Sequence, residues 1–266
     1  MNNLALRHLE MGQTEKGVAL LRRAVRIEEN ELGKDHPQLI ESLANLAVAI
    51  GRLESAPNRR ELLSEAMAIY VRAEKIARKT YGVKHLKYAH VAHQMAVFLV
   101  NHFKEYPRAL RILRGSTIAR IQHINAATGG PSDAGTNLRR QHRAAFLDHL
   151  RFVGKVTGPA GIDPHAAAKE TFPVAQMMGA LNTARAVGRM AARLGAGDDE
   201  LARLIRERQD ATDRWRRLDG ELIRAVSRSP RERDQKREAE LKQELGKLSG
   251  RLRAIGGTIK AKFPNY

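Results

Sequence analysis

The feature that most constrains this chain is an internal repeat in its first half. The triplet Asn-Leu-Ala at residues 3–5 recurs at residues 45–47, and the segment 17–36 recurs 49 residues later as 66–85. Self-similarity at a period of roughly 20–50 residues is typical of stacked helical units, each of which buries its apolar face against the next. The repeat therefore predicts an all-α solenoid in this half.

Each copy of the repeat is predicted to contain two helices. The two offsets between copies, 42 and 49 residues, predict an inserted loop near residues 55–61, where Pro57 and Asn58 interrupt a helix. A third, weaker copy runs from Met95 to about Ile124. Small and aliphatic residues recur at matched positions of the second helices, as closely approaching helices require: Ala19, Leu20, Ala24 and Ile27, then Ala68, Ile69, Ala73 and Ile76.

The ends of these helices carry their own signals. Gly33 and Gly82 follow the second helices of the first two copies, where a left-handed backbone suits glycine. Asp35 is predicted to cap the next helix, with Pro37 in its first turn, where the missing N–H does no harm.

The string Leu-Gly-Lys-Asp-His-Pro at residues 32–37, with Ala24 and the Asn-Leu-Ala triplets, resembles the tetratricopeptide repeat of the kinesin light chain type. The second copy departs from it, with Lys-His-Leu at residues 84–86. The resemblance covers a predicted domain of residues 1–124 and implies a concave helical surface that binds a peptide or protein segment. The alternative is that three short repeats only support the rest of the chain.

Residues 125–197 are predicted to be a connector. A loop at 125–137 contains glycines but no Lys-Ser/Thr ending, so it is not a phosphate-binding loop of the Walker type. Helical spacing returns at 138–156, breaks at the Gly-Pro-rich residues 158–164, and resumes from 165 to about 194. Three methionines in this last helix are predicted to be core residues: Met177, Met178 and Met190.

Residues 198–266 are predicted to form a long antiparallel helical hairpin, coiled-coil-like in its 3-4 spacing. Asp198 is placed to cap the first arm. Ser229, Pro230 and Glu232 together predict the start of the second arm, as a cap, a first-turn proline and a capping box.

Apolar residues form one seam along each arm, interrupted only by Arg208, which we expect to extend its charge outward along its aliphatic stem. A turn near residue 229 predicts four contacts across the seam: Leu218 with Leu241, Trp215 with Leu245, Ala211 with Leu248, and Leu204 with Ile255.

The string Arg-Glu-Arg-Gln-Asp at 206–210, with Trp215, Leu218, Leu222 and the ending Phe-Pro-Asn-Tyr at 263–266, gives residues 170–266 a second resemblance. They are similar to the segment ahead of the caspase-like domain in bacterial TPR–CHAT proteins. The resemblance implies the non-catalytic part of such a protein, with the peptidase domain beyond Tyr266.

No catalytic, cofactor-binding or metal-binding residue is predicted. The chain has no cysteine, which excludes disulfides, thiolate nucleophiles and thiolate metal sites within it. His90 and His93 share a helical face near His85, and His142 and His149 are seven residues apart, yet no third ligand or His-Glu-x-x-His pattern accompanies them. Carboxylates such as those of Glu28, Glu29 and Glu31 are expected on charged helix faces.

The net charge of +18 is spread along the whole chain, without the aromatic platform or zinc module of nucleic-acid binders. The first thirty residues lack a secretory pattern, and no apolar stretch is long enough to span a bilayer. We therefore expect a cytoplasmic scaffold that binds a protein or peptide, with no cofactor and no membrane contact. A truncated cysteine peptidase, a basic nucleic-acid binder and a homodimer through the hairpin remain open alternatives.

Overall fold

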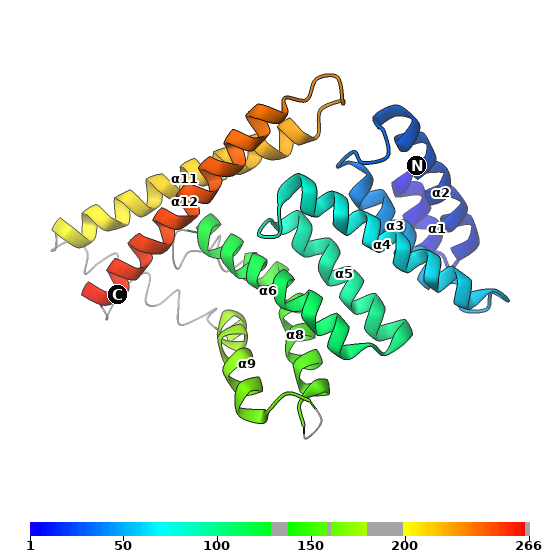
Figure 1. The fold of residues 1–266 in the computed structure, drawn as a ribbon, viewed down its shortest axis with the longest axis horizontal. Coiled ribbons are helices and arrows are strands. Elements are labelled where there is room, and N and C mark those ends of the chain that lie inside the picture. The colour runs from blue at the N-terminus through cyan, green and yellow to red at the C-terminus, as the bar shows by residue number, and fades with distance from the viewer. Residues whose placement is uncertain (129–137, 159–160, 180–198, 264–266) are drawn as a thin grey trace. The chain divides into compact units, whose positions relative to one another are not determined.

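The computed structural model describes residues 1–128, 138–158, 161–179 and 199–263 (Figure 1). Within these ranges the regular elements are all helices, beside one isolated bridge between Thr157 and Ile162, so the all-α prediction is confirmed. The chain divides into two compact units. The first comprises residues 1–119 and 227–233, and the second comprises 120–226 and 234–266.

Three helix pairs follow one another in the order that the repeat predicts. Each helix packs on the next from α1 to α5, and α3 also packs on α5. α6 begins in the first unit and ends in the second. The pairs are α1 (Asn2–Glu10) with α2 (Thr14–Leu32), α3 (Leu39–Gly51) with α4 (Arg59–Tyr81), and α5 (Leu86–Phe103) with α6 (Tyr106–Thr128).

Small residues set how closely the helices of the repeats approach. A Cβ atom added at Gly17 would lie 2.6 Å from Cδ2 of Leu9, so only glycine allows α1 and α2 this separation. Ala66 occupies the equivalent position of the second copy and is fully buried. A Cβ atom at Gly51 would lie 2.9 Å from Cε2 of Phe98, at the crossing of α3 and α5. Of the small positions noted in the repeat, Ala24 and Ala73 are buried packing positions. Ala19 and Ala68 are exposed, so the prediction is wrong for this pair.

Ion pairs link the second helices of neighbouring repeats. Arg22 of α2 contacts Glu65 of α4 at 2.7 Å, and one heptad further along each helix Arg72 pairs with Glu29. Arg72 also donates to the backbone oxygen of Lys34. These contacts join the first two repeats on a face away from their apolar core.

Gly33 and Gly82 end their helices with positive φ, as predicted, but not in the predicted left-handed helical conformation. Gly33 has φ 86° and ψ 156°, and Gly82 has φ 83° and ψ 161°. These values lie outside the left-handed helical region and in an extended region with positive φ, which is essentially restricted to glycine. A Cβ would be strained at both positions.

The prediction of Asp35 as a cap is wrong, because α3 begins at Leu39 and its N-cap is Gln38, which makes no side-chain cap bond. Nδ1 of His36 accepts from the backbone N–H of Gln38 at 3.3 Å. In the second copy, Nδ1 of His85 accepts from Lys87 at 3.0 Å. An imidazole acceptor reaches the N–H two residues ahead, and the repeat preserves this arrangement.

The inserted loop lies at residues 52–58, close to its predicted place, and α4 begins at Arg59. The guanidinium of Arg59 donates to the backbone oxygens of Leu53 at 2.8 Å and Gly51 at 3.1 Å. Arg59 thereby satisfies carbonyl groups that the end of α3 leaves open.

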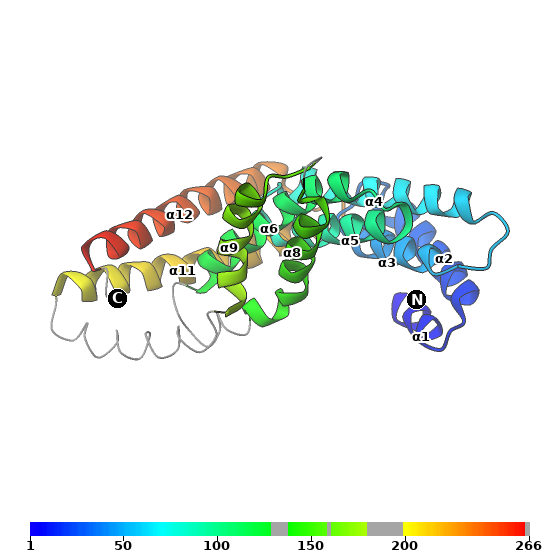
Figure 2. The same ribbon diagram turned by 90° about the horizontal axis from the view of Figure 1, so that it is seen from below.

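In the second unit, α8 (Arg143–Val156) and α9 (Pro164–Gly179) lie side by side (Figure 2). Ile124, Phe146 and Val174 form the core between them and the end of α6, with Met177 and Met178 packed against it. These two methionines are core residues, as predicted. Met190, the helix expected to reach residue 194 and the cap Asp198 lie outside the described residues.

The loop predicted at 125–137 begins later than expected, because α6 continues to Thr128. Ala126 is buried in this last turn, so its packing favours helix over the turn tendency of the Asn and Thr around it. Residues 129–137 lie outside the described part of the chain.

The hairpin consists of α11 (Asp199–Val226) and α12 (Gln235–Lys262), which run antiparallel (Figure 1). Leu204 and Ile255 meet in one apolar cluster with Leu201 and Ile259, which confirms that predicted contact. The indole N–H of Trp215 donates to Oγ of Ser249 at 3.0 Å. Every other residue named in the four predicted contacts is also buried.

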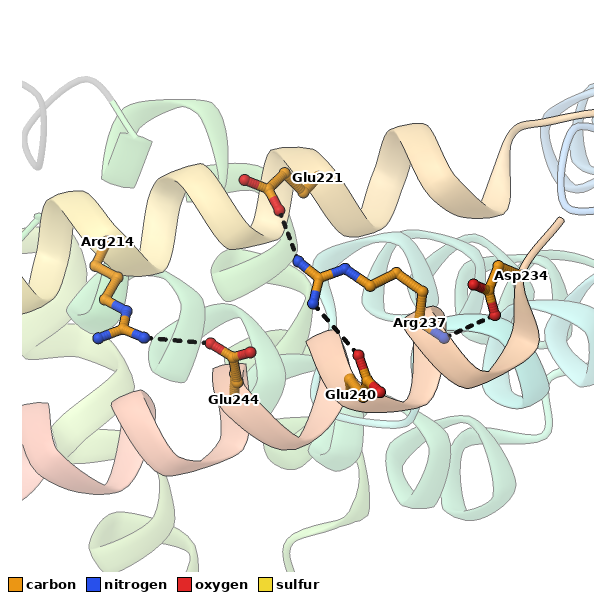
Figure 3. Close-up of polar contacts among 6 residues, drawn as sticks. All are labelled: Arg214, Glu221, Asp234, Arg237, Glu240 and Glu244. Atoms are coloured by element: carbon orange, nitrogen blue, oxygen red, sulfur yellow. Dashed lines mark hydrogen bonds and ion pairs between the residues drawn. The ribbon is translucent and has the colours of Figure 1, made fainter. Parts of the chain in front are cut away.

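Ion pairs across the two arms fit the same register (Figure 3). Arg214 contacts Glu244 at 3.4 Å, and Arg237 contacts Glu221 at 3.4 Å. Arg251 contacts Glu207 at 2.9 Å further along the hairpin. Arg208 is half-buried. The charged residues thus flank the apolar seam on its accessible sides.

The start predicted for the second arm is wrong, because α12 begins at Gln235. Asp234 is its cap and accepts from the backbone N–H of Arg237 at 3.0 Å (Figure 3). Ser229 and Glu232 instead close a separate turn, in which Oγ of Ser229 donates to Oε2 of Glu232 at 2.8 Å. An extended backbone at Asp234 suits a cap better than this turn does.

The turn 227–233 belongs to the first unit and contacts the loop between its first two repeats. Nε2 of His36 donates to the backbone oxygen of Arg228 at 2.7 Å, and the amide of Gln38 donates to the oxygen of Ser227 at 3.3 Å. Both ring nitrogens of His36 are therefore engaged, Nδ1 with Gln38 and Nε2 with Arg228.

Candidate functional site

The first helices of the three repeats carry accessible residues at one shared position. Applying the repeat offsets, Asn3 of α1, Asn45 of α3 and Gln94 of α5 are equivalent, and each is exposed or half-buried. One turn further along lie Leu6, Val48 and Val97, which are likewise equivalent and at least partly accessible. We call these six residues the amide stripe.

Direct contacts make the amide stripe continuous. α3 packs on α5, and Nδ2 of Asn2 on α1 donates to Oγ of Ser42 on α3 at 2.7 Å. Packed helices have axes about 8–10 Å apart. Side-chain amides at one helical position therefore recur at about this interval along the stripe.

The amides of the stripe are not used within the described chain. Asn3 and Asn45 have no hydrogen bond there, and Oε1 of Gln94 is buried without a partner. A buried acceptor without a partner is costly, so such an atom is an exception that calls for an explanation. Asn2 donates between helices through Nδ2, while its Oδ1 is buried without a partner like Oε1 of Gln94.

A side-chain amide can hydrogen-bond a peptide backbone, because it carries the same donor and acceptor. An extended peptide advances about 3.3 Å per residue, so amides about 10 Å apart match every third residue of it. Leu6, Val48 and Val97 would contact its aliphatic side chains. The stripe suits an extended peptide, because its residues recur along three successive helices.

A hollow of about 620 Å³ lies beside one end of the stripe. It is bordered by residues 12–16, at the start of α2, by the loop 52–58 and by Leu62. Its charged lining is balanced between Glu15, Lys16, Arg52 and Glu54. Arg52 follows Val48 by about one helical turn, so it links the hollow to the stripe residues of α3. This hollow can extend a peptide site but shows no chemistry of its own.

The structure brings one serine and one carboxylate together. Oγ of Ser42 donates to Oε1 of Glu28 at 2.9 Å and accepts from Asn2. Ser42 is only 1% exposed, so a substrate cannot reach it. The trio ties α1, α2 and α3 together. The sequence predicted Glu28 on a charged helix face. It instead accepts a hydrogen bond between helices.

The histidines are placed in structural contacts. His85 stacks on Tyr81 with ring centres 4.7 Å apart, and Nε2 of His149 lies 3.1 Å from a carboxylate oxygen of Glu170. His90 and His93 lie on α5 with other interactions. Over the described ranges, no three His, Asp or Glu side chains are grouped to hold a metal ion.

A buried arginine in the second unit is the most perturbed titratable group there. Burial lowers the pKa of the Arg120 guanidinium to about 10. Nη1 of Arg120 donates to Nδ1 of His142 at 3.1 Å, at the junction of α6 with the segment before α8. The side chain is 3% exposed and lines no cleft that the described residues form, so its role is structural.

The family comparison matches the first repeat. A tetratricopeptide repeat model matches residues 1–38, which cover α1, α2 and the loop to α3. No curated protein matches the sequence. Tetratricopeptide repeats indicate a protein–protein interaction scaffold. Among the described helices, none is long and apolar enough to cross a membrane.

Sequence reasoning identified the Asn-Leu-Ala triplets but not the amide stripe. The third copy was recognised from Met95 onward, and Gln94 is the residue immediately before it. Gln-Met-Ala at residues 94–96 matches the Asn-Leu-Ala triplets when the first position of the pattern allows either Asn or Gln. Exposure separates this position from its buried neighbours, and exposure is visible only in the structure.

Proposed function

We propose that the repeat unit binds an extended segment of a partner protein along the amide stripe. The observation that carries this proposal is the set of three side-chain amides at equivalent positions, none of which is fully used within the chain. The aliphatic residues beside them favour a segment with small or aliphatic side chains. This makes the chain a scaffold that recruits a protein through its main chain.

The order of repeats first and helical hairpin second is also the one expected for the non-catalytic region of a TPR–CHAT-like protein. The hairpin supports this finer proposal, because Trp215, Leu218 and Leu222, which carry the resemblance, are buried in its seam. In this arrangement the repeats recruit a partner or substrate for a separate caspase-like domain. With no cysteine, these residues contribute no peptidase nucleophile themselves. Reading the coding sequence past Tyr266 tests this: a stop codon there would contradict it.

Selection from a displayed library of random linear peptides tests the binding proposal. We expect selected peptides to bind the full chain and to lose about tenfold or more in affinity when Asn45→Ala and Gln94→Ala are combined, since two hydrogen bonds of about 0.5–1.5 kcal/mol each are removed. Gln176→Ala, at an exposed amide of α9, is the matched control and should bind normally. Equal binding by the double variant would reject the amide stripe.

The net charge of +18 supports a second candidate, a nucleic-acid binder. Phosphate contacts give binding that falls steeply with salt. A titration of duplex DNA and of RNA at about 50 mM and about 200 mM salt distinguishes the two candidates. We expect no saturable binding at the lower salt concentration; binding with a steep salt slope would favour nucleic acid.

A further inference from the structure

The outer edge of α1 exposes large apolar side chains. Met1, Leu4 and Met11 are 53%, 52% and 61% exposed. Their spacings of 3 and 7 residues place them on one side of the helix, with His8 between Leu4 and Met11. This edge is distinct from the amide stripe, whose residues on α1 are Asn3 and Leu6.

The equivalent residues of the other repeats are buried. Met1 and Leu4 correspond to Leu43 and Leu46 of α3, which are 1% and 4% exposed. Leu46 corresponds in turn to Met95 of α5, which is 8% exposed. A helix of the preceding repeat packs against each of these two helices.

The first helices that carry these buried residues pack against the second helices of the preceding repeats. α2 packs on α3, and α4 packs on α5, so in both cases the second helix of one repeat meets the first helix of the next. The edge of α1 is the next face of the same series. A contiguous exposed apolar edge marks an interaction surface.

We propose that the edge of α1 binds an amphipathic helix of a partner protein, in the position that α2 takes on α3. Continuity with the two established inter-repeat interfaces specifies this occupant: a helix with small and aliphatic residues at 3-4 spacing, like that of α2. Exposed Arg7, three residues after Leu4, lies beside the edge and can pair with a charge beside that apolar face. The surface is separate from the one proposed for an extended peptide.

A stapled peptide of residues 13–33 is the probe, because α2 packs on α3, the helix equivalent to α1. Glu15 and Ala19 are both exposed on α2 and four residues apart, so a staple between them leaves the packing face intact. Its binding to the full chain is measured by fluorescence polarisation. Leu4→Glu places a charge on the edge, and Val71→Glu, at a 44% exposed position of α4, is the matched control. Circular dichroism verifies that both variants are folded.

We expect saturable binding by the wild-type chain and by Val71→Glu, and at least tenfold weaker binding by Leu4→Glu. Met11→Glu should weaken binding in the same direction and serves if Leu4→Glu fails to fold. Absence of binding, or equal binding by all variants, would overturn the proposal. So would a dimer in sedimentation equilibrium that Leu4→Glu dissociates, because a second copy would then occupy the edge.

Discussion

The repeat unit and the hairpin are both built from paired helices, but they achieve their packing in different ways. In the repeats, small residues such as Gly17 and Ala66 let helices approach closely, and each helix contacts several others. In the hairpin, long aliphatic side chains fill one seam between two arms, and ion pairs follow its sides. Repeat helices therefore have faces left over for partners, whereas the hairpin buries its apolar residues against itself.

Glycine shows the contrast most directly. Gly17 and Gly51 sit where an added Cβ would lie within 3 Å of a neighbouring side chain. Gly246 and Gly250 of α12 have nothing within 4 Å of that position. The same residue type is thus a packing requirement in one region and an uncompensated cost to helix stability in the other.

Truncating a core leucine in each region should have the largest effect. We expect Leu21→Ala and Leu222→Ala, at residues 0% and 1% exposed, each to lower the free energy of unfolding by about 2–5 kcal/mol. Because helices in contact with several others relax less around a cavity, the loss should be greater for Leu21→Ala. Urea denaturation followed by circular dichroism measures both, and the reverse order would break the comparison.

Enlarging glycine should have opposite effects in the two regions. Gly17→Leu overpacks the crossing of α1 and α2, and we expect a loss of about 1–3 kcal/mol. Gly246→Leu places a better helix former in open space and should gain up to about 1 kcal/mol. Thermal unfolding of the two variants shows whether each substitution raises or lowers stability. A change in the same direction for both would contradict the contrast.

Ser249→Ala tests the polar contact inside the hairpin seam. The variant leaves the indole N–H of Trp215 without its partner, so we expect a loss of about 1 kcal/mol. Trp215 is the single tryptophan of the chain, and its emission should shift as its surroundings change. Ser64→Ala, at an exposed serine that bonds only within α4, should leave both quantities unchanged.

The smallest effect concerns pH and the repeat unit. Burial, together with Arg59 and Lys104, lowers the pKa of His102 below its ordinary 6.5. Between the unfolded pKa of about 6.5 and the lower folded pKa, His102 is protonated in the unfolded chain and neutral in the folded chain. The free energy of unfolding therefore falls as the pH drops through this range, and the loss levels off below the folded pKa. In urea denaturations at several pH values, His102→Gln should reduce the dependence of the free energy of unfolding on pH. An unchanged pH dependence would mean that another group causes it.

The repeat and the hairpin register could be predicted because both depend on periodic patterns of many residues. Helix caps depend on single residues, and alternative caps differ by only about 1 kcal/mol in helix stability. The caps predicted at Asp35 and Ser229 are therefore wrong, and α12 is capped by Asp234 instead. Glu28, Ser42 and Asn2 come from three different helices. Their meeting is a property of the packed structure and leaves no local pattern in the sequence.

The most direct test of the proposed scaffold uses NMR on the full chain with a selected peptide. The side-chain amide resonances of Asn3, Asn45 and Gln94 report the amide stripe, and the indole N–H of Trp215 reports the hairpin. We predict that the peptide shifts the three amide resonances in a saturable manner and leaves the indole resonance in place. A peptide that moves the indole resonance and leaves the amides unchanged would contradict binding by the repeats.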